Sequence, residues 1–561
     1  PRLRRRSLHP HPHQRINHSI TQIILHTPLI PHHPLTRQPQ NTILCLSQNS
    51  IHSQLTLLVA GIRLVGMMTR LLFVFFAMFL AFAEAASYQL VRSEVPDVQR
   101  EFRGAWVAVV YNIDWPSRPG LSAAAQRAEL RAIMDRAAGA GLNAIMFQIR
   151  PAGDAIYRSK HEPWAHWLTG KGGGDPGYDP LEEAIRLAHA RGIELHAWFN
   201  PFRAQASLKH PLSRRHLASS GNSWVKTFGD HRWFDPSSRE SHTQALKVIL
   251  DVTRRYDIDG VHLDDYFYPY PKVINGRSVQ DFPDSKEYER YRRGGGTLGK
   301  HDWRRDNVNR FVRSLYVEVK KAKPWVRVGI SPFGIWRPGV PRGTEAGLDS
   351  YDHLFADSRL WLAKGWCDYL APQLYWRDAG PQSFSKLITW WRSQSQIRPV
   401  WPGIATSRID SKEDPGRPAS EIIKQIKLSR RIGNSSAGHL HWSMKSLMQN
   451  RGGILKQLGP AYQGPALPPA MPWLGRTAPA APNLRAEIVN GETILHFSPN
   501  KAGAGVRKWV VQIRQDGKWR TYQVVQGPYQ QLRLPMRPEL IALRGVSGYG
   551  NLGPASVLQI R

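Results

Sequence analysis

Between Glu101 and Leu458 the chain alternates short apolar runs with amphipathic stretches. A short apolar run bounded by turn residues indicates a buried strand, and apolar residues spaced three and four apart indicate a helix. This pattern predicts eight strands, at residues 102–110, 142–150, 193–202, 261–263, 326–330, 367–376, 399–405 and 438–444. The helices predicted between them lie at 122–139, 180–191, 238–256, 306–323, 357–365, 383–395 and 419–432, and a last helix ends near 458.

The predicted helices carry ordinary start and stop signals. Ser122 is suited to an N-cap, Pro180 to a first helical turn, and Pro324 ends the long helix before it. Strictly alternating strands and helices are typical of an α/β fold, here a (β/α)8 TIM barrel over residues 101–458. A doubly wound open sheet is the alternative, but no Gly-rich phosphate-binding fingerprint follows the first strand.

The pattern changes after the barrel. Residues 459–482 are rich in Pro and Ala and lack periodicity, which is typical of a linker. Residues 483–561 contain short apolar runs separated by turns, which predicts a small all-β sandwich. It resembles a fibronectin type III or immunoglobulin-like module, especially in its late strand followed by GYGNLGPAS. We therefore expect a protease-sensitive linker and a barrel that folds without the sandwich.

The N-terminal region has a different composition. Residues 1–66 are rich in His, Pro and Arg and lack a lasting period, which predicts disorder or an upstream extension that is not made. Residues 67–85 combine Met67 or Met68, a positive charge, an apolar run and small residues, in the order of a secretory signal peptide. We expect export to the periplasm or cell envelope, with a mature start near Glu84 or Ala86; a retained anchor is the alternative.

Charge and cysteine content narrow the choice of partners. The formal net charge is +33, and no Asp or Glu precedes Glu84. In an exported protein this excess favours contact with anionic polymers or lipid headgroups of the envelope rather than nucleic acid. Cys45 and Cys367 are the only cysteines, so signal cleavage would leave one and exclude a disulfide framework.

The strongest candidate for chemistry is the stretch DIDGVHLDDYFYPYP at residues 257–271. Asp264 and Asp265 follow its short apolar strand, where carboxylates are costly to desolvate without a partner or a function. Alternate strand residues share a face, so His262, Asp264 and Tyr266 point one way, and Asp265 points the other way unless the strand bends. Aromatic rings beside carboxylates suit a sugar site. The alternative is that the acids cap the next loop and the tyrosines only pack.

Other predicted strand ends are also polar and aromatic, as expected at the catalytic face of a barrel. The candidate substrate-binding residues are Arg150, Tyr157, His196, Trp198, Asn200, Arg203, His262, Tyr266, Tyr268, Trp336, Gln373, Tyr375, Trp376 and Trp442. Each has a structural alternative: aromatics can close a barrel, Arg150 and Asp154 can form an ion pair, and His196 and His262 can be satisfied core histidines.

Six segments carry a family resemblance: FQIRPAGDAIY, DPGYDPLEEAI, HAWFNPFR, DGVHLDDYFYP, ISPFGIW and YLAPQLYW. In this order they resemble a bacterial glycosyl-hydrolase-like family once catalogued as a domain of unknown function, over residues 101–458. The resemblance implies a (β/α)8 barrel in the cell envelope. The family includes a divisome-localised glycosidase that cuts peptidoglycan glycan strands stripped of stem peptides. The resemblance therefore implies peptidoglycan glycan strands as the substrate and cell-division proteins as partners. That relative is a lipoprotein, whereas no Cys follows the apolar run here.

Glycoside hydrolysis generally needs two carboxyl groups. The D-G-x-x-x-D spacing that ends at Asp264 is similar to strand four of amylase-like and chitinase-like barrels, but Tyr266 stands where chitinases have their acidic Glu. The second carboxyl is then Asp265 or Asp154, with Asp114 and Glu162 as weaker choices. No cofactor or metal is expected. Two alternatives stay open: a metal-dependent hydrolase or sugar deacetylase that uses His196 or His262, and a catalytically silent glycan-binding barrel.

Overall fold

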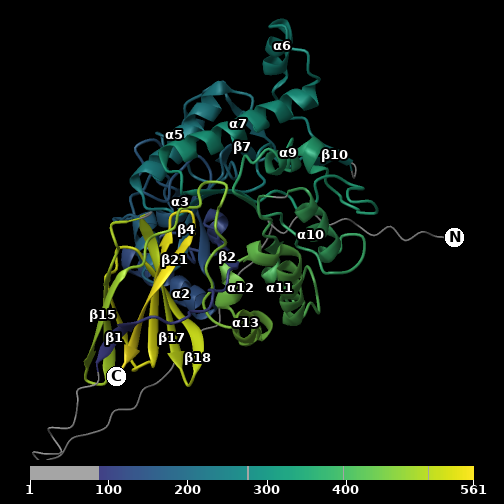
Figure 1. Ribbon diagram of the computed structural model, residues 1–561. Coiled ribbons are helices and arrows are strands. Elements are labelled where there is room, and N and C mark those ends of the chain that lie inside the picture. Colours follow the sequence, from purple (N-terminus) through teal and green to yellow (C-terminus); the bar gives the residue numbers. More distant parts are fainter. Residues whose placement is uncertain (1–86, 275–276, 396, 503–504) are drawn as a thin grey trace, which may run out of the picture. The chain divides into compact units, whose positions relative to one another are not determined.

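A computed structural model describes residues 87–561, apart from 275–276, 396 and 503–504 (Figure 1). The expectations for residues 1–66 and 67–85 lie outside the described residues. Within the described part, no helix combines the length and the apolar character that a membrane span requires.

The eight predicted strands form one parallel sheet. Its strands, in the order in which they pair, are β12 (Tyr369–Leu370), β11 (Arg327–Ile330), β8 (Gly260–Leu263), β4 (Glu194–Phe199), β3 (Ala144–Arg150), β2 (Phe102–Val107), β14 (Gly438–His441) and β13 (Gly403–Ile404). Parallel bridges from Leu370 to Val400 and from Gln373 to Gly403 join the two ends of the sheet. The sheet is therefore closed into a barrel. Its sixth and seventh strands are shorter than predicted because most of residues 371–402 run as irregular backbone and turns around α10.

Helices cover the outside of the barrel. They are α2 (Ala123–Gly139), α4 (Pro180–His189), α5 (Arg239–Arg255), α7 (Lys300–Ala322), α9 (Ser358–Ala363), α10 (Phe384–Ser393), α11 (Ala419–Gly433), α12 (Met444–Met448) and α13 (Ile454–Tyr462). Ser122 caps α2 through its hydroxyl, and Asp179 caps α4 with Pro180 in the first turn. The last predicted helix is divided into α12 and α13 by a turn in which Gly452 and Gly453 have positive φ.

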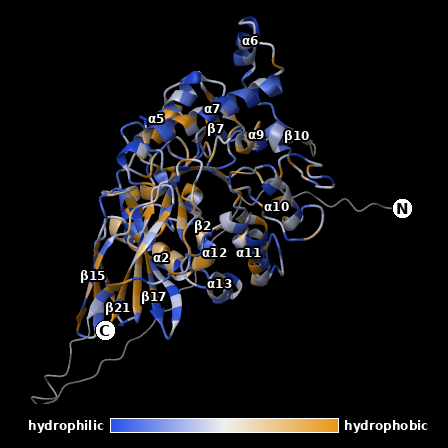
Figure 2. Ribbon diagram, viewed as in Figure 1, coloured by the Kyte–Doolittle hydropathy of each residue, from blue (hydrophilic) through white to orange (hydrophobic). Residues whose placement is uncertain are grey.

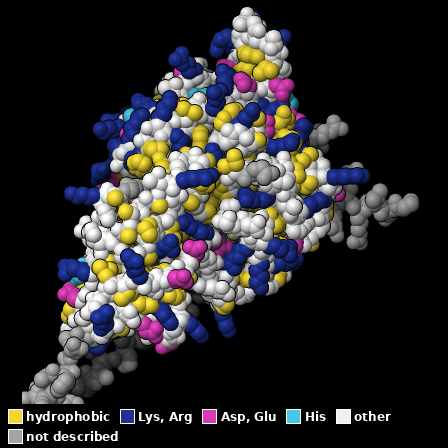
Figure 3. All heavy atoms as spheres, viewed as in Figure 1, with side chains coloured by type: hydrophobic (Ala, Val, Ile, Leu, Met, Phe, Trp, Pro, Cys, Tyr) yellow, Lys and Arg dark blue, Asp and Glu magenta, His cyan; other side chains and the backbone are white. Residues whose placement is uncertain are grey.

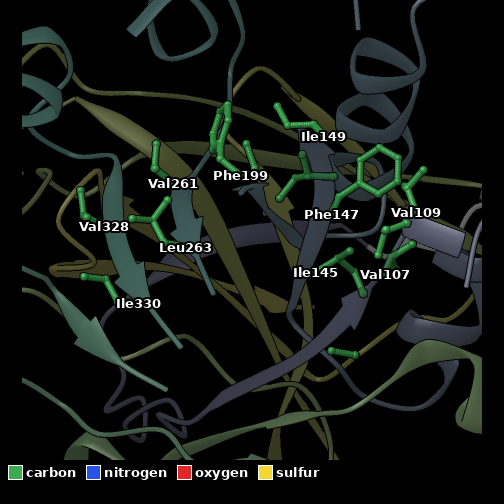
Figure 4. Packing of buried hydrophobic residues seen from close by; sticks show 14 of the residues in the cluster. Val107, Val109, Ile145, Phe147, Ile149, Phe199, Val261, Leu263, Val328 and Ile330 are labelled. Atoms are coloured by element: carbon green, nitrogen blue, oxygen red, sulfur yellow. The ribbon is translucent and has the colours of Figure 1, made fainter. Parts of the chain in front are cut away.

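Side-chain alternation along the strands separates two cores. Val107, Ile145, Phe147 and Ile149 project from one face of β2 and β3 into the cluster packed under the helices (Figure 4). The opposite face fills the barrel with a smaller cluster that includes Phe102, Trp106, Met146, Trp198, Tyr369 and Trp401. Gly329 makes room for this interior, because a Cβ there would lie 1.9 Å from the Tyr369 ring.

Long loops follow the carboxyl ends of the strands. They carry α3 (His166–Thr169), the three-stranded sheet of β5 (Arg203–Gln205), β6 (Val225–Phe228) and β7 (His231–Phe234), the hairpin of β9 (Lys272–Ile274) and β10 (Arg277–Val279), α6 (Ser285–Arg293) and α8 (Ser350–His353). Helix α6 projects away from the barrel (Figure 1). These insertions build the rim on which the predicted site residues lie.

The C-terminal region is an all-β domain of two sheets. One contains β15 (Asn483–Val489), β16 (Glu492–Ser498) and β19 (Gln531–Leu534); the other contains β18 (Lys518–Gln526), β17 (Val506–Gln515), β20 (Leu540–Ser547), β21 (Leu552–Ile560) and β1 (Tyr88–Val91). Apolar residues run along its strands, and hydrophilic residues dominate the outer helices of the barrel (Figure 2). Strand β1, which the sequence pattern did not predict, pairs antiparallel with β21, so both ends of the described chain belong to this domain.

The domain packs against the amino-terminal ends of the barrel strands. Lys508 Nζ lies 2.6 Å from Glu194 Oε1 at the start of β4, and Arg507 lies 2.7 Å from Asp257 before β8. The segment predicted to be a linker is packed rather than free: Leu467 is 1 % exposed and contacts apolar residues of the domain, and its backbone pairs with Gln99 and Glu101. These contacts argue against an independent barrel joined to the sandwich by a flexible connection.

Candidate active site

The paired carboxylates lie at the carboxyl end of the barrel, opposite the all-β domain. Strand β8 ends at Leu263, and Asp264 and Asp265 follow it with exposed fractions of 5 % and 3 %. The chain bends at Asp265, so the strict alternation expected of a strand has ended there. Both side chains therefore need partners from neighbouring strand ends.

Asp264 is held from the side of β4. Its carboxylate accepts hydrogen bonds from Trp198 Nε1 at 3.2 Å, from the Asn200 amide, and from the backbone N–H of Tyr266 at 3.3 Å. Burial, reinforced by the charge of Asp265, nevertheless raises the pKa of Asp264 to about 7. Asp264 can therefore hold a proton at neutral pH.

Asp265 is held from the opposite side. Gln373, which follows β12, donates to its carboxylate at 3.1 Å, and the Tyr270 hydroxyl donates to the other oxygen. The two neighbouring carboxyl groups therefore have different hydrogen-bond partners. A carboxyl group whose pKa is raised to about 7 beside a second carboxyl group allows Asp264 to act as an acid and Asp265 as a nucleophile or base.

Arg203 and Tyr266 border this pair. The guanidinium lies over the Tyr266 ring, 4.8 Å from its centre, and donates to Asn200 Oδ1 at 2.8 Å and to the Pro151 carbonyl at 2.8 Å. Asn200 also accepts a hydrogen bond of 2.7 Å from Gln148 Nε2. The predicted residues Asn200, Arg203 and Tyr266 are therefore brought together around Asp264.

Arg150 has a structural partner other than the one proposed from the sequence. It makes a bidentate ion pair with Glu162, at 2.8 and 2.6 Å, and neither side chain is more than 1 % exposed. Asp154 instead accepts from the Ala152 backbone N–H at 3.0 Å, and burial raises its pKa to about 7. Arg150 and Glu162 thus stabilise the loops, and Asp154 is a buried carboxyl near Arg203 rather than half of an ion pair.

The weaker candidate Asp114 is also engaged structurally. It accepts from Ser443 Oγ at 2.6 Å and from the backbone N–H groups of Ala108 at 2.8 Å and Lys445 at 2.7 Å. These bonds join the loop after β2 to the loop after β14.

His196 and His262 lie inside the barrel, not on its rim. Trp106 Nε1 donates to His262 Nε2 at 3.0 Å, Tyr369 lies 2.9 Å from Nδ1 of each histidine, and His196 Nε2 lies 3.1 Å from Glu194. Because an indole can only donate, His262 accepts from Trp106 and donates to the Tyr369 hydroxyl. That hydroxyl then donates to His196, which donates to the Glu194 carboxylate. The prediction that these histidines contact substrate is wrong: both are fully buried, with both ring nitrogens bonded.

The same contacts leave His196 and His262 no free ring nitrogen for the metal ion of the metal-dependent alternative. A metal-binding histidine needs one ring nitrogen free for the ion. Across the described part of the chain, no group of three or more His, Cys, Asp or Glu side chains is arranged to hold a metal ion.

Two predicted aromatic contacts also belong to the core. Tyr157 and Tyr268 are 0 % exposed. Tyr157 packs edge-on against Tyr256, and Tyr268 packs against Phe282 and Phe355. Their rings pack within the core and are not available to a substrate, which is the structural alternative given for these aromatics in the sequence.

The remaining aromatics form a partly exposed rim. Trp442 and Tyr375 stack with ring centres 6.3 Å apart, and Trp442 also contacts Trp106 and Trp198 edge-on. Trp376 packs edge-on against Phe333, and Trp336 stacks with Trp390. The site therefore combines two buried carboxylates, as glycoside hydrolysis generally needs, with partly exposed aromatic side chains.

Comparison with known proteins agrees with this geometry. The sequence profile described as glycosyl hydrolase-like 10 matches residues 101–416. The chain belongs to the glycosyl hydrolase-like 10 family. This confirms the family resemblance found in the six sequence segments, and the chain is a glycosidase with a polysaccharide as its class of substrate.

Two relatives give the extent of the similarity. The chain is 42 % identical over 398 residues to glycosyl hydrolase YngK of Bacillus subtilis (strain 168), covering 69 % of this chain and 76 % of that protein. It is 35 % identical over 361 residues to glycosyl hydrolase DigH of Escherichia coli (strain K12), covering 58 % of this chain and 79 % of that protein.

Solved structures are only distantly similar. The glycoside hydrolase domain of PgaB (BpsB) from Bordetella bronchiseptica matches with a TM-score of 0.44 and 12 % identity, over 64 % of this chain and 98 % of that one. The endo-β-1,4-mannanase from Thermotoga petrophila matches with a TM-score of 0.39 and 10 % identity, over 82 % and 98 %. Neither likeness bears on residue roles.

Sequence reasoning did not assign two polar residues that this glycosyl hydrolase-like 10 site uses. Tyr270, which donates to Asp265, belongs to the same aromatic run as Tyr266 and could have been included for that reason. Gln148 was visible at a strand end, but its contact with Asn200 depends on strand pairing across the barrel.

The raised pKa of Asp264 predicts a pH-dependent effect on stability. The folded-state pKa of Asp264 is about 7, above the ordinary value of an unfolded aspartate. Between these two pKa values the unfolded state loses its proton first, so the free energy of unfolding falls as the pH rises toward 7. Asp264→Asn removes this ionisation. We expect the variant to gain thermal stability over wild type at pH 8, and to gain less at pH 5.

The measurement is the melting temperature of both proteins at the two pH values. Asp516→Asn, in an exposed turn of the all-β domain, is the matched control and should show no such pH-dependent difference. An equal effect of Asp264→Asn at pH 5 and pH 8 would contradict the assignment of a raised pKa.

Proposed function

We propose that this glycosidase is exported and cleaves the glycan strands of peptidoglycan, with preference for strands stripped of their peptides. The observation that carries the catalytic part is the pKa of about 7 that burial and the neighbouring charge of Asp265 give to Asp264. Paired carboxyl groups with different proton affinities are what glycoside hydrolysis uses.

In the proposed mechanism Asp264 gives its proton to the glycosidic oxygen as the bond from that oxygen to the anomeric carbon breaks. Asp265 either attacks the anomeric carbon or takes a proton from the water that attacks it. Positive charge develops on the sugar ring in the transition state, and an ionised Asp265 in a water-poor site stabilises it. Asn200 and Trp198 fix the orientation of Asp264.

The substrate and location rest on the sequence. The six family segments resemble a group that includes a glycosidase of denuded peptidoglycan, and residues 67–85 follow the order of a secretory signal peptide. Periplasmic or envelope placement, cell-division proteins as partners and contact of the basic surface with the envelope are parts of this proposal. Lys and Arg side chains are spread over the visible face rather than gathered into one patch (Figure 3), which fits diffuse attraction to an anionic envelope.

The all-β domain is proposed to be fibronectin type III-like. Its first, second and fifth strands after the barrel pair in one sheet, and its third, fourth, sixth and seventh pair in the other, which is consistent with that module. We propose that it supports the amino-terminal face of the barrel rather than the cleavage site.

Mass spectrometry of the products from intact and amidase-treated peptidoglycan tests the function. We expect the wild-type chain to release glycan fragments mainly from the amidase-treated material, and chelator treatment to leave this release unchanged. Release of acetate without chain cleavage would instead identify a deacetylase. Equal release from both preparations would remove the preference for peptide-free strands.

A further inference from the structure

An exposed tyrosine stands on a strained turn that follows β2. Tyr111 lies in the short helix η1 (Val110–Asn112) that follows β2, and it is 40 % exposed. Its φ is +56° and that of Asn112 is +49°, in the left-handed region that side chains other than Gly rarely occupy. Such strain persists only where the surrounding structure imposes it, and it concentrates at functional positions.

The turn is hydrogen-bonded to the residues that orient Asp264. Gln148 Oε1 accepts hydrogen bonds of 2.9 Å from the backbone N–H groups of both Val109 and Val110. The amide nitrogen of the same Gln148 donates to Asn200, and Asn200 donates to Asp264. Two buried amides therefore connect the Tyr111 turn to a proposed catalytic carboxyl and fix their relative positions.

The side chain of Tyr111 is held in place and remains partly exposed. Its hydroxyl donates to the Ala206 carbonyl at 2.7 Å, while its ring contacts Trp167 at 5.3 Å and His210 at 5.4 Å. Part of this large aromatic side chain is therefore open to a ligand.

The residues behind the ring are uncharged and not fully hydrogen-bonded. Burial lowers the pKa of His166 to about 4 and also lowers the pKa of His210, so both imidazoles are neutral at neutral pH. Trp167 Nε1, His166 Nε2 and His210 Nδ1 are buried and lack a partner among the described residues. Neutral rings packed behind Tyr111 give it an uncharged aromatic support, which suits an uncharged ligand such as a sugar.

Arg203 connects the cluster electrostatically with the proposed catalytic pair. Arg203 stacks over Tyr266 beside Asp264, and the charge of Arg203 opposes the effect of burial on the pKa of Tyr111. We propose that Tyr111, backed by Trp167 and His210, forms a sugar-binding subsite next to the Asp264–Asp265 pair, with its ring stacked on the C–H face of a sugar residue of the bound strand. This inference rests on the proposed function, because it takes a glycan as the ligand.

Binding to purified glycan strands of increasing length, measured by calorimetry in the Asp264→Asn background, tests this subsite. We expect Tyr111→Ala to weaken binding about tenfold, a loss of about 1.4 kcal/mol, on strands long enough to reach Tyr111. Tyr111→Phe keeps the ring and should stay within about twofold of the parent, given the modest net value of one hydrogen bond. Tyr529→Ala removes a tyrosine of similar exposure, 45 %, from the all-β domain and should have no effect.

Turnover by otherwise wild-type chains gives the second readout. Tyr111→Ala should raise KM on long strands and leave kcat within about threefold, as for loss of binding shared by ground and transition states. If the parent binds the strands and Tyr111→Ala binds them equally well at every length, the subsite is wrong and the proposed function stands. If the parent binds no glycan strand, both proposals are wrong.

Discussion

Asp264→Asn is expected to lower turnover of glycan strands at least about a hundredfold, with binding of the strands largely kept. The substitution keeps the size of the side chain and an oxygen that can accept from Trp198 and Asn200. It removes the proton that Asp264 holds at neutral pH, and with it assistance to the leaving oxygen. Turnover and binding are measured on the same glycan preparation.

Activated substrates separate the roles of the two aspartates. If Asp264 is the acid, an aryl glycoside with a good leaving group should partly restore the rate of Asp264→Asn and should not restore that of Asp265→Asn. Asp154→Asn should have a smaller effect than either, because the hydrogen bond that Asp154 accepts comes from the backbone of Ala152 in its own loop and not from a residue that holds the pair. Normal turnover by a folded Asp264→Asn variant would refute the catalytic assignment and leave this stretch as a binding surface.

Lys508→Met is expected to lower the free energy of unfolding by about 3 kcal/mol, the scale for removal of one partner from a buried ion pair. Lys508 belongs to the all-β domain, yet its ammonium lies 2.6 Å from Glu194 at the start of β4. Burial opposes the charge on Glu194, and Lys508 and Arg327 outweigh it and hold the Glu194 pKa well below its usual value. Without Lys508, a buried carboxylate loses its shortest ion pair.

Urea denaturation of the full chain provides the measurement. Lys518→Met, at an exposed position of the neighbouring strand β18, is the matched control and should change stability by less than about 0.5 kcal/mol. Deletion of residues 483–561 should give an insoluble or strongly destabilised barrel for the same reason. A soluble, cooperative barrel after this deletion would restore the expectation from sequence that residues 101–458 fold alone.

Local sequence was sufficient for the elements of the barrel. All eight strands and their intervening helices follow from runs of apolar residues and from caps such as Ser122 and Asp179, because strand burial and helix capping depend on residues near in sequence. The position of Asp264 and Asp265 after β8 was predicted in the same way. Their grouping with Asn200, Gln373 and Trp198 followed from the rule that strand ends meet at one face.

Contacts between distant segments were not predictable from these patterns. Strand alternation placed His196 and His262 on the same face as Trp198 and Asp264. Only depth along the barrel decided that the histidines and Trp198 are interior and that Asp264 lies at the carboxyl end. Arg150 pairs with Glu162 rather than with Asp154, which is nearer in sequence. The loop between Arg150 and Glu162 folds back and allows a bidentate ion pair with the Glu162 carboxylate.

By itself, the sequence determined the order and type of the barrel elements, the family, and the carboxylate pair at the end of β8. The tertiary structure alone decided which partners give Asp264 and Asp265 different environments, and that β1 joins the all-β domain. It also decided that Lys508 neutralises a charge inside the barrel. The physical reason is that proton affinity and buried pairing depend on desolvation and on groups brought together across hundreds of residues, which no local pattern encodes.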